Sequence, residues 1–469
     1  MSNVTKTDSR RRVDASLRWL GALGIALFAL VSTACKRKEA TEASPSAAPS
    51  ATPEAPVAPP PRCAPAKDAT TFAIRGRQKP LDEAEAGIDL PYAAEVGTAA
   101  ARAGGFALGA LRYDDGAPHA LVALSDGEGK HSQFVELGRV HGPADPPQVA
   151  SRGDEVFVAV VGSDAAGPTL RLARLDARAP NVASSLTWCA EVQQGRDDSS
   201  AFSIAVRPSE PGGVLVWDEY DSEEERAVVR SIAWSGEQCG KVRSPTRLSP
   251  AGADAEAPRV VARSGGYWLA WLAPERAASS PAADATRGES PEGSPKSSAD
   301  LESVVDLVPR GLVLAPLDTR GELAGEPRRV TEAGAHVVAF ELTATSDGSA
   351  LLAWRDDPTA PGAEGRAVSL AWIALDGSVA RHRLEDERFA AGAPMLSVDA
   401  RGVAWLAVAS ADSEVLLGVA TKSGVAELEP EPRLASRQLL AAHDGRVLFA
   451  EPRGLDATLG VLRCTPRAR

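Results

Sequence analysis

The stretch GGYWLAWLAP (residues 265–274) decides the fold class. Two glycines precede an apolar run with two tryptophans, and weaker copies of this arrangement recur along the chain. The copies are GGFALGAL (104–111), GDEVFVAV (153–160), GGVLVW (212–217), DGSALLAW (347–354), RGVAWLAV (401–408) and DGRVLFA (444–450). Together they make seven units about 50 residues apart, a period that is typical of a β-propeller.

Each copy is followed by the same pieces. A polar loop leads to a second apolar run, such as GLVLAPLD (311–318) or AVSLAWIALD (367–376), and then to a weaker strand. The unit is therefore strand A, a glycine turn, strand B, an acidic loop, strand C, a turn and strand D. Strand B is apolar throughout because neighbouring blades cover both of its faces. An ordinary β-sandwich pair would not need seven copies, so the sequence predicts an all-β, seven-bladed propeller of four-stranded blades.

Ring closure can be predicted from the two ends of this repeat. The chain ends at Arg469, soon after strand C of blade seven (457–463), and leaves no room there for a strand D. The segment ATTFAIR (69–75) is a spare strand upstream of blade one. Adding it to blade seven would leave no long unpaired edge between the first and last blades.

The N-terminus reads as an export signal. Positive residues up to Arg18 precede the apolar run WLGALGIALFAL (19–30), and small residues then lead to Cys35. This resembles a bacterial lipoprotein signal, which implies cleavage after residue 34 and lipidation of Cys35. Ser32 departs from that pattern, which has Leu, Val or Ile there. An uncleaved anchor and ordinary secretion stay open, although the run is shorter than the roughly 20 residues that span a bilayer.

The remaining features complete the predicted organisation. Residues 1–34 form the signal peptide, and residues 35–68 form a disordered linker that includes the Pro/Ala-rich tether at 39–62. The propeller covers 69–469 and contains a disordered insert at about 276–300. Lys36, directly after the lipidated cysteine, favours the outer membrane as destination.

Four cysteines remain once Cys35 is lipidated: Cys63, Cys189, Cys239 and Cys464. An even number in an exported chain suggests two disulfides, with three possible connectivities. A bond between Cys63 and Cys464 would lock the ring closure, and it would leave Cys189 to pair with Cys239.

One blade carries a recognisable family motif. The segment SDGSALLAW (346–354) resembles the SPDGxxIAF hallmark of TolB-type, WD-like bacterial propeller repeats, and 399–405 and 443–449 are poorer copies. The resemblance implies a propeller fold and a binding role. It transfers no catalytic residue.

The sequence offers little support for catalysis or metal binding. It has no GxSxG, HExxH, P-loop, GxGxxG or EF-hand motif. The segment 397–405 nearly matches a sialidase box but has one residue too many. The acidic loop 218–225 has the wrong spacing to wrap a calcium ion. The sequence therefore predicts no catalytic residue, no metal site and no cofactor.

Acidic residues follow strand B in every blade, where propeller loops share one face. They would form an acidic rim around the channel and attract a basic protein segment or a cation. Exposed loops of an acidic protein contain acids in any case, and this alternative stays open. The predicted rim comprises Asp114, Asp115, Asp164, Asp218, Glu219, Glu275, Asp356, Asp357, Asp412 and Glu451. The strand-B tryptophans Trp217, Trp271 and Trp354 are predicted to pack in the core.

The formal net charge of −12 argues against a nucleic-acid partner, which would need a basic face. We expect a monomeric, lipid-anchored envelope protein, facing the periplasm or the exterior, that binds another envelope protein or a basic segment without catalysis. The rivals are a glycan hydrolase or lyase and a ligand sensor, each with its site at the channel mouth. Carboxylates clustered with an Arg or Tyr at the channel would favour the enzyme, whereas unclustered acids on a broad rim would favour partner binding.

Overall fold

The hairpin of blade four contains the glycine pair that opens the quoted stretch. Strands β16 (Glu256–Arg263) and β17 (Gly266–Pro274) pair antiparallel, and Gly265 and Gly266 have φ angles of 74° and 154°. A Cβ atom on Gly266 would lie 2.0 Å from the carbonyl oxygen of Leu317 in the next strand. The hairpin therefore needs glycine at 265 for the turn, and at 266 also for the close approach of strand C.

The apolar run after these glycines is buried on both faces, as predicted for strand B. The first seven residues of β17 are buried. Trp268 packs into the cluster that blade four shares with blade five. Tyr267 and Trp271 pack into the cluster shared with blade three. The tryptophans of this one strand thus connect three blades.

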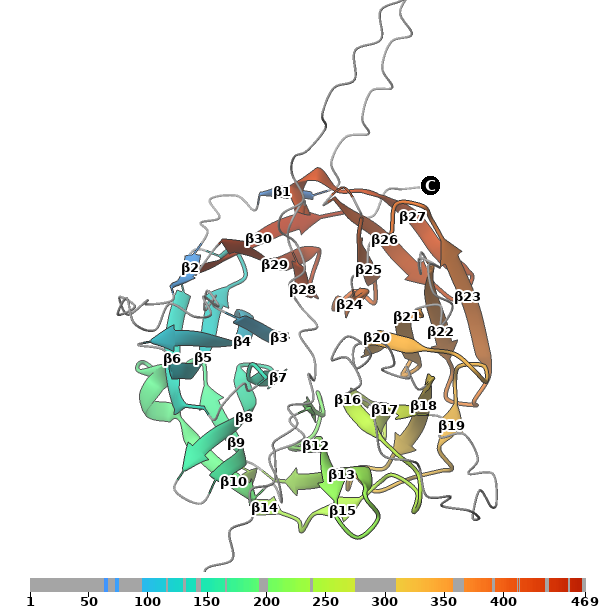
Figure 1. Cartoon of the computed structure of the whole chain (residues 1–469). Coiled ribbons are helices and arrows are strands. Elements are labelled where there is room, and N and C mark those ends of the chain that lie inside the picture. Colours follow the sequence, from blue (N-terminus) through green and yellow to red (C-terminus); the bar gives the residue numbers. More distant parts are fainter. Residues whose placement is uncertain are drawn as a thin grey trace, which may run out of the picture. The chain divides into compact units, whose positions relative to one another are not determined.

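Seven antiparallel sheets surround a central axis (Figure 1), which confirms the predicted seven-bladed propeller. Blade one consists of β3 (Glu95–Arg102), β4 (Gly105–Asp114), β5 (Ala117–Asp126) and β6 (Ser132–Arg139). Blade two consists of β7 (Gln148–Arg152), β8 (Glu155–Asp164), β9 (Gly167–Asp176) and β10 (Thr187–Gln193). Blade three consists of β11 (Phe202–Val206), β12 (Gly212–Asp221), β13 (Arg226–Ser235), β14 (Lys241–Val242) and β15 (Thr246–Arg247).

The other four blades follow the same plan. Blade four adds β18 (Arg310–Leu317) and β19 (Arg328–Arg329) to β16 and β17. Blade five consists of β20 (Val337–Ala344), β21 (Ala350–Asp356), β22 (Ala367–Ile373) and β23 (Val379–Glu385). Blade six consists of β24 (Met395–Val398), β25 (Ala404–Ala409), β26 (Val415–Thr421) and β27 (Gly424–Pro430). Blade seven consists of β28 (Gln438–His443), β29 (Arg446–Arg453) and β30 (Asp456–Cys464), joined by β1 (Cys63–Pro65) and β2 (Phe72–Arg75).

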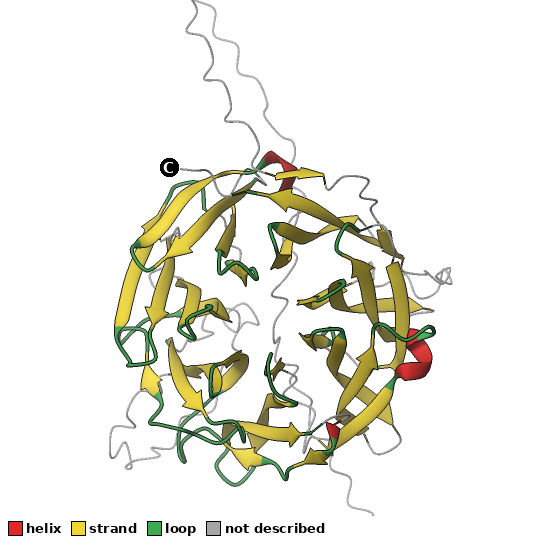
Figure 2. Cartoon of the chain, turned by 180° about the vertical axis from the view of Figure 1, so that it is seen from behind, coloured by secondary structure: helices red, strands yellow, loops and turns green. Residues whose placement is uncertain are grey.

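These blades come from a computed structural model. Its described residues are 63–65, 72–75 and 95–465, without 115–116, 130–131, 141–144, 165–166, 194–200, 237–238, 275–308, 357–366, 390–392, 411, 413, 435–437 and 454–455. Two short 3-10 helices, η2 (Val182–Ser185) and η5 (Pro432–Leu434), accompany the strands (Figure 2). The predicted signal peptide, the tether at 39–62 and the insert at 276–300 lie outside the described residues.

The hydrophobic core lies between the blades. Blades two and three share a cluster that includes Phe157 and Trp217, and blades six and seven share one that includes Trp405 and Phe449. The first and last blades are joined in the same way, since Leu108 of blade one packs in one cluster with Ile74 and Leu459. Each blade buries its faces only because it has neighbours, so the ring must close to be stable.

The inner strands are aligned by hydroxyl groups that reach the next blade. The N–H of Val149 donates to Thr98 Oγ1 at 2.8 Å, between blades one and two. Ser203 and Ser397 accept the same kind of bond from the next inner strand, at 3.1 Å and 2.8 Å. These bonds satisfy backbone N–H groups that have no partner within their own sheet. They also fix the positions of neighbouring inner strands relative to one another along the channel axis.

The chain's two ends meet in blade seven. Strand β2 pairs with β30, which confirms the closing strand predicted at 69–75. Strand β1 pairs with β30 as well, so Cys63–Pro65, which the sequence analysis placed in the linker, belongs to blade seven. The N–H of Cys63 also donates to the buried carboxylate of Glu431 at 3.0 Å.

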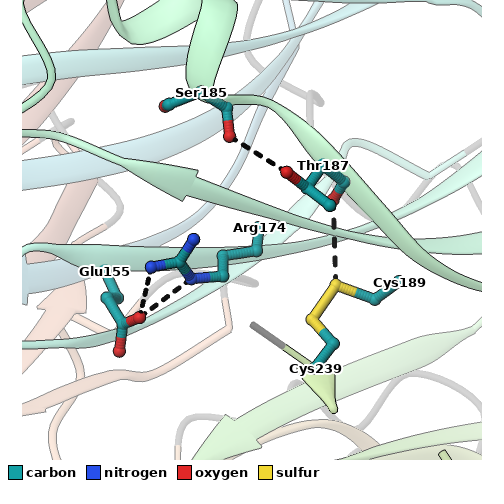
Figure 3. Close-up of a disulfide and its surroundings, with 6 residues drawn as sticks. All are labelled: Glu155, Arg174, Ser185, Thr187, Cys189 and Cys239. Carbon is teal, nitrogen blue, oxygen red and sulfur yellow. Dashed lines mark hydrogen bonds and ion pairs between the residues drawn. A yellow bond between two sulfur atoms is a disulfide. The ribbon is translucent and has the colours of Figure 1, made fainter. Parts of the chain in front are cut away.

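Two disulfides join the cysteines in the predicted pairs. Cys63 bonds to Cys464 across the closure, with Cα atoms 4.1 Å apart. Cys189 on β10 bonds to Cys239 in the segment between β13 and β14, and it links blade two to blade three with Cα atoms 5.5 Å apart (Figure 3).

Candidate functional site: the channel mouth

Charged side chains occur on or just before several inner strands, in the half of the ring next to the B–C loops. Glu95 opens β3 and is paired with Leu111, near the end of β4. Arg259 on β16 and Glu341 on β20 lie further along their strands and are paired with the middle residues of β17 and β21. Asp145 lies in the connection that leads into β7. Because all seven inner strands enter the ring from the same face, Glu95 and Asp145 lie at one mouth of the channel, and Arg259 and Glu341 lie behind them on the channel wall. The charge of Arg259 acts on both Asp145 and Glu341, which joins the four residues electrostatically.

Glu95 has a phenol as hydrogen-bond partner. The hydroxyl of Tyr113, at the end of β4, donates to Glu95 Oε1 at 2.7 Å. Burial raises the pKa of Glu95, the Tyr113 hydrogen bond lowers it, and the negative charge of Asp145 raises it again, with a raised pKa as the net result. Glu95 and Asp145 are therefore coupled carboxyl groups.

Arg259 is the positive charge nearest to two of these acids. Asp145 reaches water, yet the surrounding blades displace much of its solvent, and this desolvation raises its pKa against the opposing charge of Arg259. Burial likewise raises the pKa of the half-buried Glu341, opposed by Arg259 and by a backbone hydrogen bond at Leu342. We call Glu95, Tyr113, Asp145, Arg259 and Glu341 the channel-mouth group.

Several acids elsewhere in the described blades have lowered pKa values instead. Hydrogen bonds from Arg178 and Arg102 overcome desolvation and lower the pKa of Asp154. A hydrogen bond from Arg247 lowers the pKa of Glu224 to about 2. Raised carboxyl pKa values are resolved only for Glu95, Asp145 and Glu341 among the described residues. Titratable groups whose pKa values are perturbed and that gather in one place mark a candidate functional site.

The chemistry of this group is that of a cation site. Its three carboxyl groups and one guanidinium carry a net charge of −2 when all are ionised. Because Glu95 and Glu341 are half-buried, their carboxylates are only partly hydrated, and a bound cation would be stabilised by these charges. The same raised pKa values would let a carboxyl group donate a proton at a higher pH than an ordinary Asp or Glu.

Two acids of the predicted rim are bonded within the ring. Asp218 is buried, and its Oδ2 accepts a hydrogen bond from the N–H of Ala257 in the next blade at 2.8 Å. Glu219 accepts the indole N–H of Trp217 at 2.9 Å and pairs with Arg230. Asp218 and Glu219 therefore contribute to blade packing and are not free rim charges.

The other predicted rim acids fall into two sets. Asp356 accepts the indole N–H of Trp354 at 3.1 Å, Asp412 lies exposed in a turn, and Glu451 is half-buried on β29. The side chains of Asp114, Asp115, Asp164, Glu275 and Asp357 lie outside the described part of the chain. An acidic rim thus stays a prediction. The buried tryptophans Trp217, Trp271 and Trp354 confirm the predicted core positions.

The channel-mouth group was not predicted from the sequence. A signal was available, since Glu95 begins its strand A and Asp145 stands three residues before Gln148 begins another. The four charged members come from positions up to 246 residues apart, and only the closed ring brings them to one mouth.

Metal binding and membrane spanning find no support in the described blades. No group of three or more His, Cys, Asp or Glu side chains there could hold a metal ion. None of the helices in the described ranges is long and apolar enough to cross a bilayer. Cys35, the predicted lipidation site, lies outside these ranges.

Comparisons with known proteins identify a similar fold. No protein-family model matches the chain, and no curated protein sequence matches it either. The chain is similar to the polysaccharide lyase Uly1 at a TM-score of 0.49 and 11% identity, over 84% of this chain and 97% of that one. It is also similar to the β-propeller domain of the Trilobed protease from Pyrococcus furiosus, at 0.45 and 10%, over 80% and 94%. These likenesses concern the fold alone.

Proposed function

We propose that this chain is a lipid-anchored propeller of the bacterial cell envelope that binds a basic segment of another protein at its channel mouth. One observation carries the proposal: Glu95, Asp145 and Glu341 share the mouth and all have raised carboxyl pKa values. A lysine or arginine side chain would relieve the cost of their poorly solvated charges. The binding surface is then the inner mouth rather than the outer rim.

The proposal is tested by removing two negative charges from the mouth and comparing the result with a control variant that loses two negative charges elsewhere. The test variant carries Glu95→Gln and Asp145→Asn. The matched control carries Glu136→Gln and Glu385→Gln, which remove two exposed charges on the outer strands β6 and β23. Calorimetric titration with a hexa-arginine peptide is run at about 150 mM salt, where distant surface charges are screened.

The test variant is expected to bind the peptide at least about tenfold more weakly, which corresponds to about 1.4 kcal/mol, while the control changes less than about twofold. Equal weakening in both variants would show that only net charge matters, and it would refute a site at the mouth. Circular dichroism of each variant establishes that the blades are intact.

An envelope glycan hydrolase or lyase is the second candidate. It is favoured by carboxyl groups with raised pKa values that share the mouth with Arg259 and with Tyr113, which is the cluster expected of an enzyme. The excess of three carboxyl groups over one guanidinium keeps the cation site as the first candidate. A carboxyl group that keeps its proton at higher pH can act as general acid, and an ionised neighbour can act as base or nucleophile.

The two candidates differ in what a single substitution does. Release of reducing ends or of unsaturated products from soluble polysaccharides measures turnover. For an enzyme, Glu341→Gln would lower turnover by at least about a hundredfold and leave substrate binding nearly unchanged. Absence of turnover in the unmodified protein would favour the binding function.

A further inference from the structure

One tryptophan of blade two lies outside the core. Trp188 on β10, the outermost strand of that blade, is 40% exposed, whereas Trp217, Trp234 and Trp271 are 1% exposed. An exposed tryptophan loses the apolar stabilisation that burial gives, and a ligand that covers the indole would restore it.

The backbone that carries Trp188 is bent and fixed. The register of β10 against β9 shifts between Trp188 and Ala190, so Cys189 is the extra residue of a β-bulge. Cys189 is also bonded to Cys239 of blade three (Figure 3). A bulge changes the direction of the side chains beside it, and a disulfide at the bulge holds that direction. The indole is therefore presented on a backbone with little freedom to move.

A guanidinium that belongs to an ion pair lies over one face of the ring, so a ligand would stack on the other face. The guanidinium carbon of Arg171 on β9 is 5.8 Å from the ring centroid of Trp188, within the range of a cation–π contact. Arg171 Nε is 3.2 Å from Glu191 Oε1 on β10. A Cβ atom on Gly162 would lie 3.2 Å from Arg171 Nη1, so the glycine leaves room for the guanidinium to lie across the sheet.

We propose that Trp188, Arg171 and Glu191 form a saccharide-binding surface for a neutral pyranose with equatorial hydroxyl groups, such as a glucose or N-acetylglucosamine unit. Such a ring has an apolar face of axial C–H groups that stacks on the flat indole. Its hydroxyl groups at the ring edge can accept hydrogen bonds from the guanidinium and donate to the carboxylate.

Charge and size favour this occupant over a protein partner. Arg171 and Glu191 neutralise each other, so the surface does not attract a basic segment as the channel mouth does. An acidic partner would meet a protein of net charge −12. One exposed indole and one ion pair offer far less than the roughly 1,000 Å² of a specific protein interface, which favours a small ligand.

The test is calorimetric titration of the full-length chain with cellotetraose and with the N-acetylglucosamine tetrasaccharide. Binding of at least one sugar is expected, and Trp188→Ala is expected to weaken it at least about tenfold. Trp188→Phe keeps an aromatic face and is expected to weaken sugar binding less than Trp188→Ala does. Phe134→Ala is the matched control, because Phe134 is 42% exposed on the outer strand of blade one, outside this surface, and it should leave binding unchanged.

Three results would overturn the proposal. Neither sugar binds the unmodified protein, or Trp188→Ala binds as tightly as the unmodified protein, or Phe134→Ala weakens binding as much as Trp188→Ala does. The channel-mouth variant Glu95→Gln with Asp145→Asn should bind the sugars normally. This separates the saccharide surface from the site for basic segments.

Discussion

Glu128 of blade one and Arg463 of blade seven form an ion pair across the ring closure, with 2.7 Å between Oε1 and Nη2. Arg446 of blade seven binds the same oxygen at 2.8 Å. The last strand β30 is thus held by strand pairing, by the Cys63–Cys464 disulfide and by this ionic contact with the first blade. The ring is closed by interactions between residues more than 300 positions apart.

Glu128→Gln should destabilise the ring by about 1 kcal/mol at neutral pH, because the pair is partly exposed and screened. Despite desolvation, hydrogen bonds from Arg463 and Arg446 lower the pKa of Glu128. Its contribution is therefore complete above the ordinary glutamate pKa and is lost as pH falls through the lowered value. Urea unfolding at several pH values measures this. A difference from the unmodified protein that grows in acid would contradict the ion pair.

Removal of the Cys63–Cys464 disulfide should lower the free energy of unfolding more than removal of the Cys189–Cys239 disulfide. The cysteines are 401 residues apart in one bond and 50 in the other, and chain entropy predicts a difference of about 2 kcal/mol. Urea midpoints of Cys63→Ala with Cys464→Ala and of Cys189→Ala with Cys239→Ala test the order. A larger loss in the second variant would show that loop length does not dominate.

Neighbouring glycines of blade four should respond differently to alanine. Gly265→Ala places a side chain in open space at a φ of 74°, which costs about 1 kcal/mol. Gly266→Ala would also bring Cβ to 2.0 Å from a backbone carbonyl and should cost more than about 3 kcal/mol. Thermal unfolding of both variants gives the comparison, and equal losses would argue against the close approach of β18.

Cys35→Ala tests the predicted anchor. If Cys35 is lipidated, the substitution should move the protein from the membrane fraction to the soluble fraction and remove the mass of the acyl chains. Fractionation and mass spectrometry of the full-length chain measure both changes. Continued membrane association at the mass of the uncleaved chain would instead indicate the uncleaved anchor.

The repeat could be predicted from the sequence because the glycine turn and strand B of each blade form one continuous stretch of the chain. Glycine turns and apolar runs mark each blade, and the spare segment at 69–75 with the cysteine positions predicted how the ring closes. The contribution of β1 was missed, since three residues beside a proline-rich tether show no strand pattern.

The site was harder to predict for a physical reason. The sequence places Asp218 in an acidic loop, but its carboxylate accepts a hydrogen bond from the N–H of Ala257 in the next blade. Contacts of this kind between blades leave no pattern along the chain. Glu95, Asp145, Arg259 and Glu341 are ordinary charged residues in weak inner strands. Their shared environment depends on ring geometry, which determines both the desolvation and the coupling of their charges.

The pH dependence of hexa-arginine binding tests the channel mouth most directly, because the charge of the peptide is nearly constant between about pH 4.5 and about pH 6.5, and the titration is then that of the protein. Raised carboxyl pKa values in the free protein predict that affinity rises with pH, as Glu95, Asp145 and Glu341 ionise, and then levels off. The variant with Glu95→Gln and Asp145→Asn should show a much flatter profile. A profile that is flat in the unmodified protein, or equally steep in the variant, would contradict a cation site at the mouth.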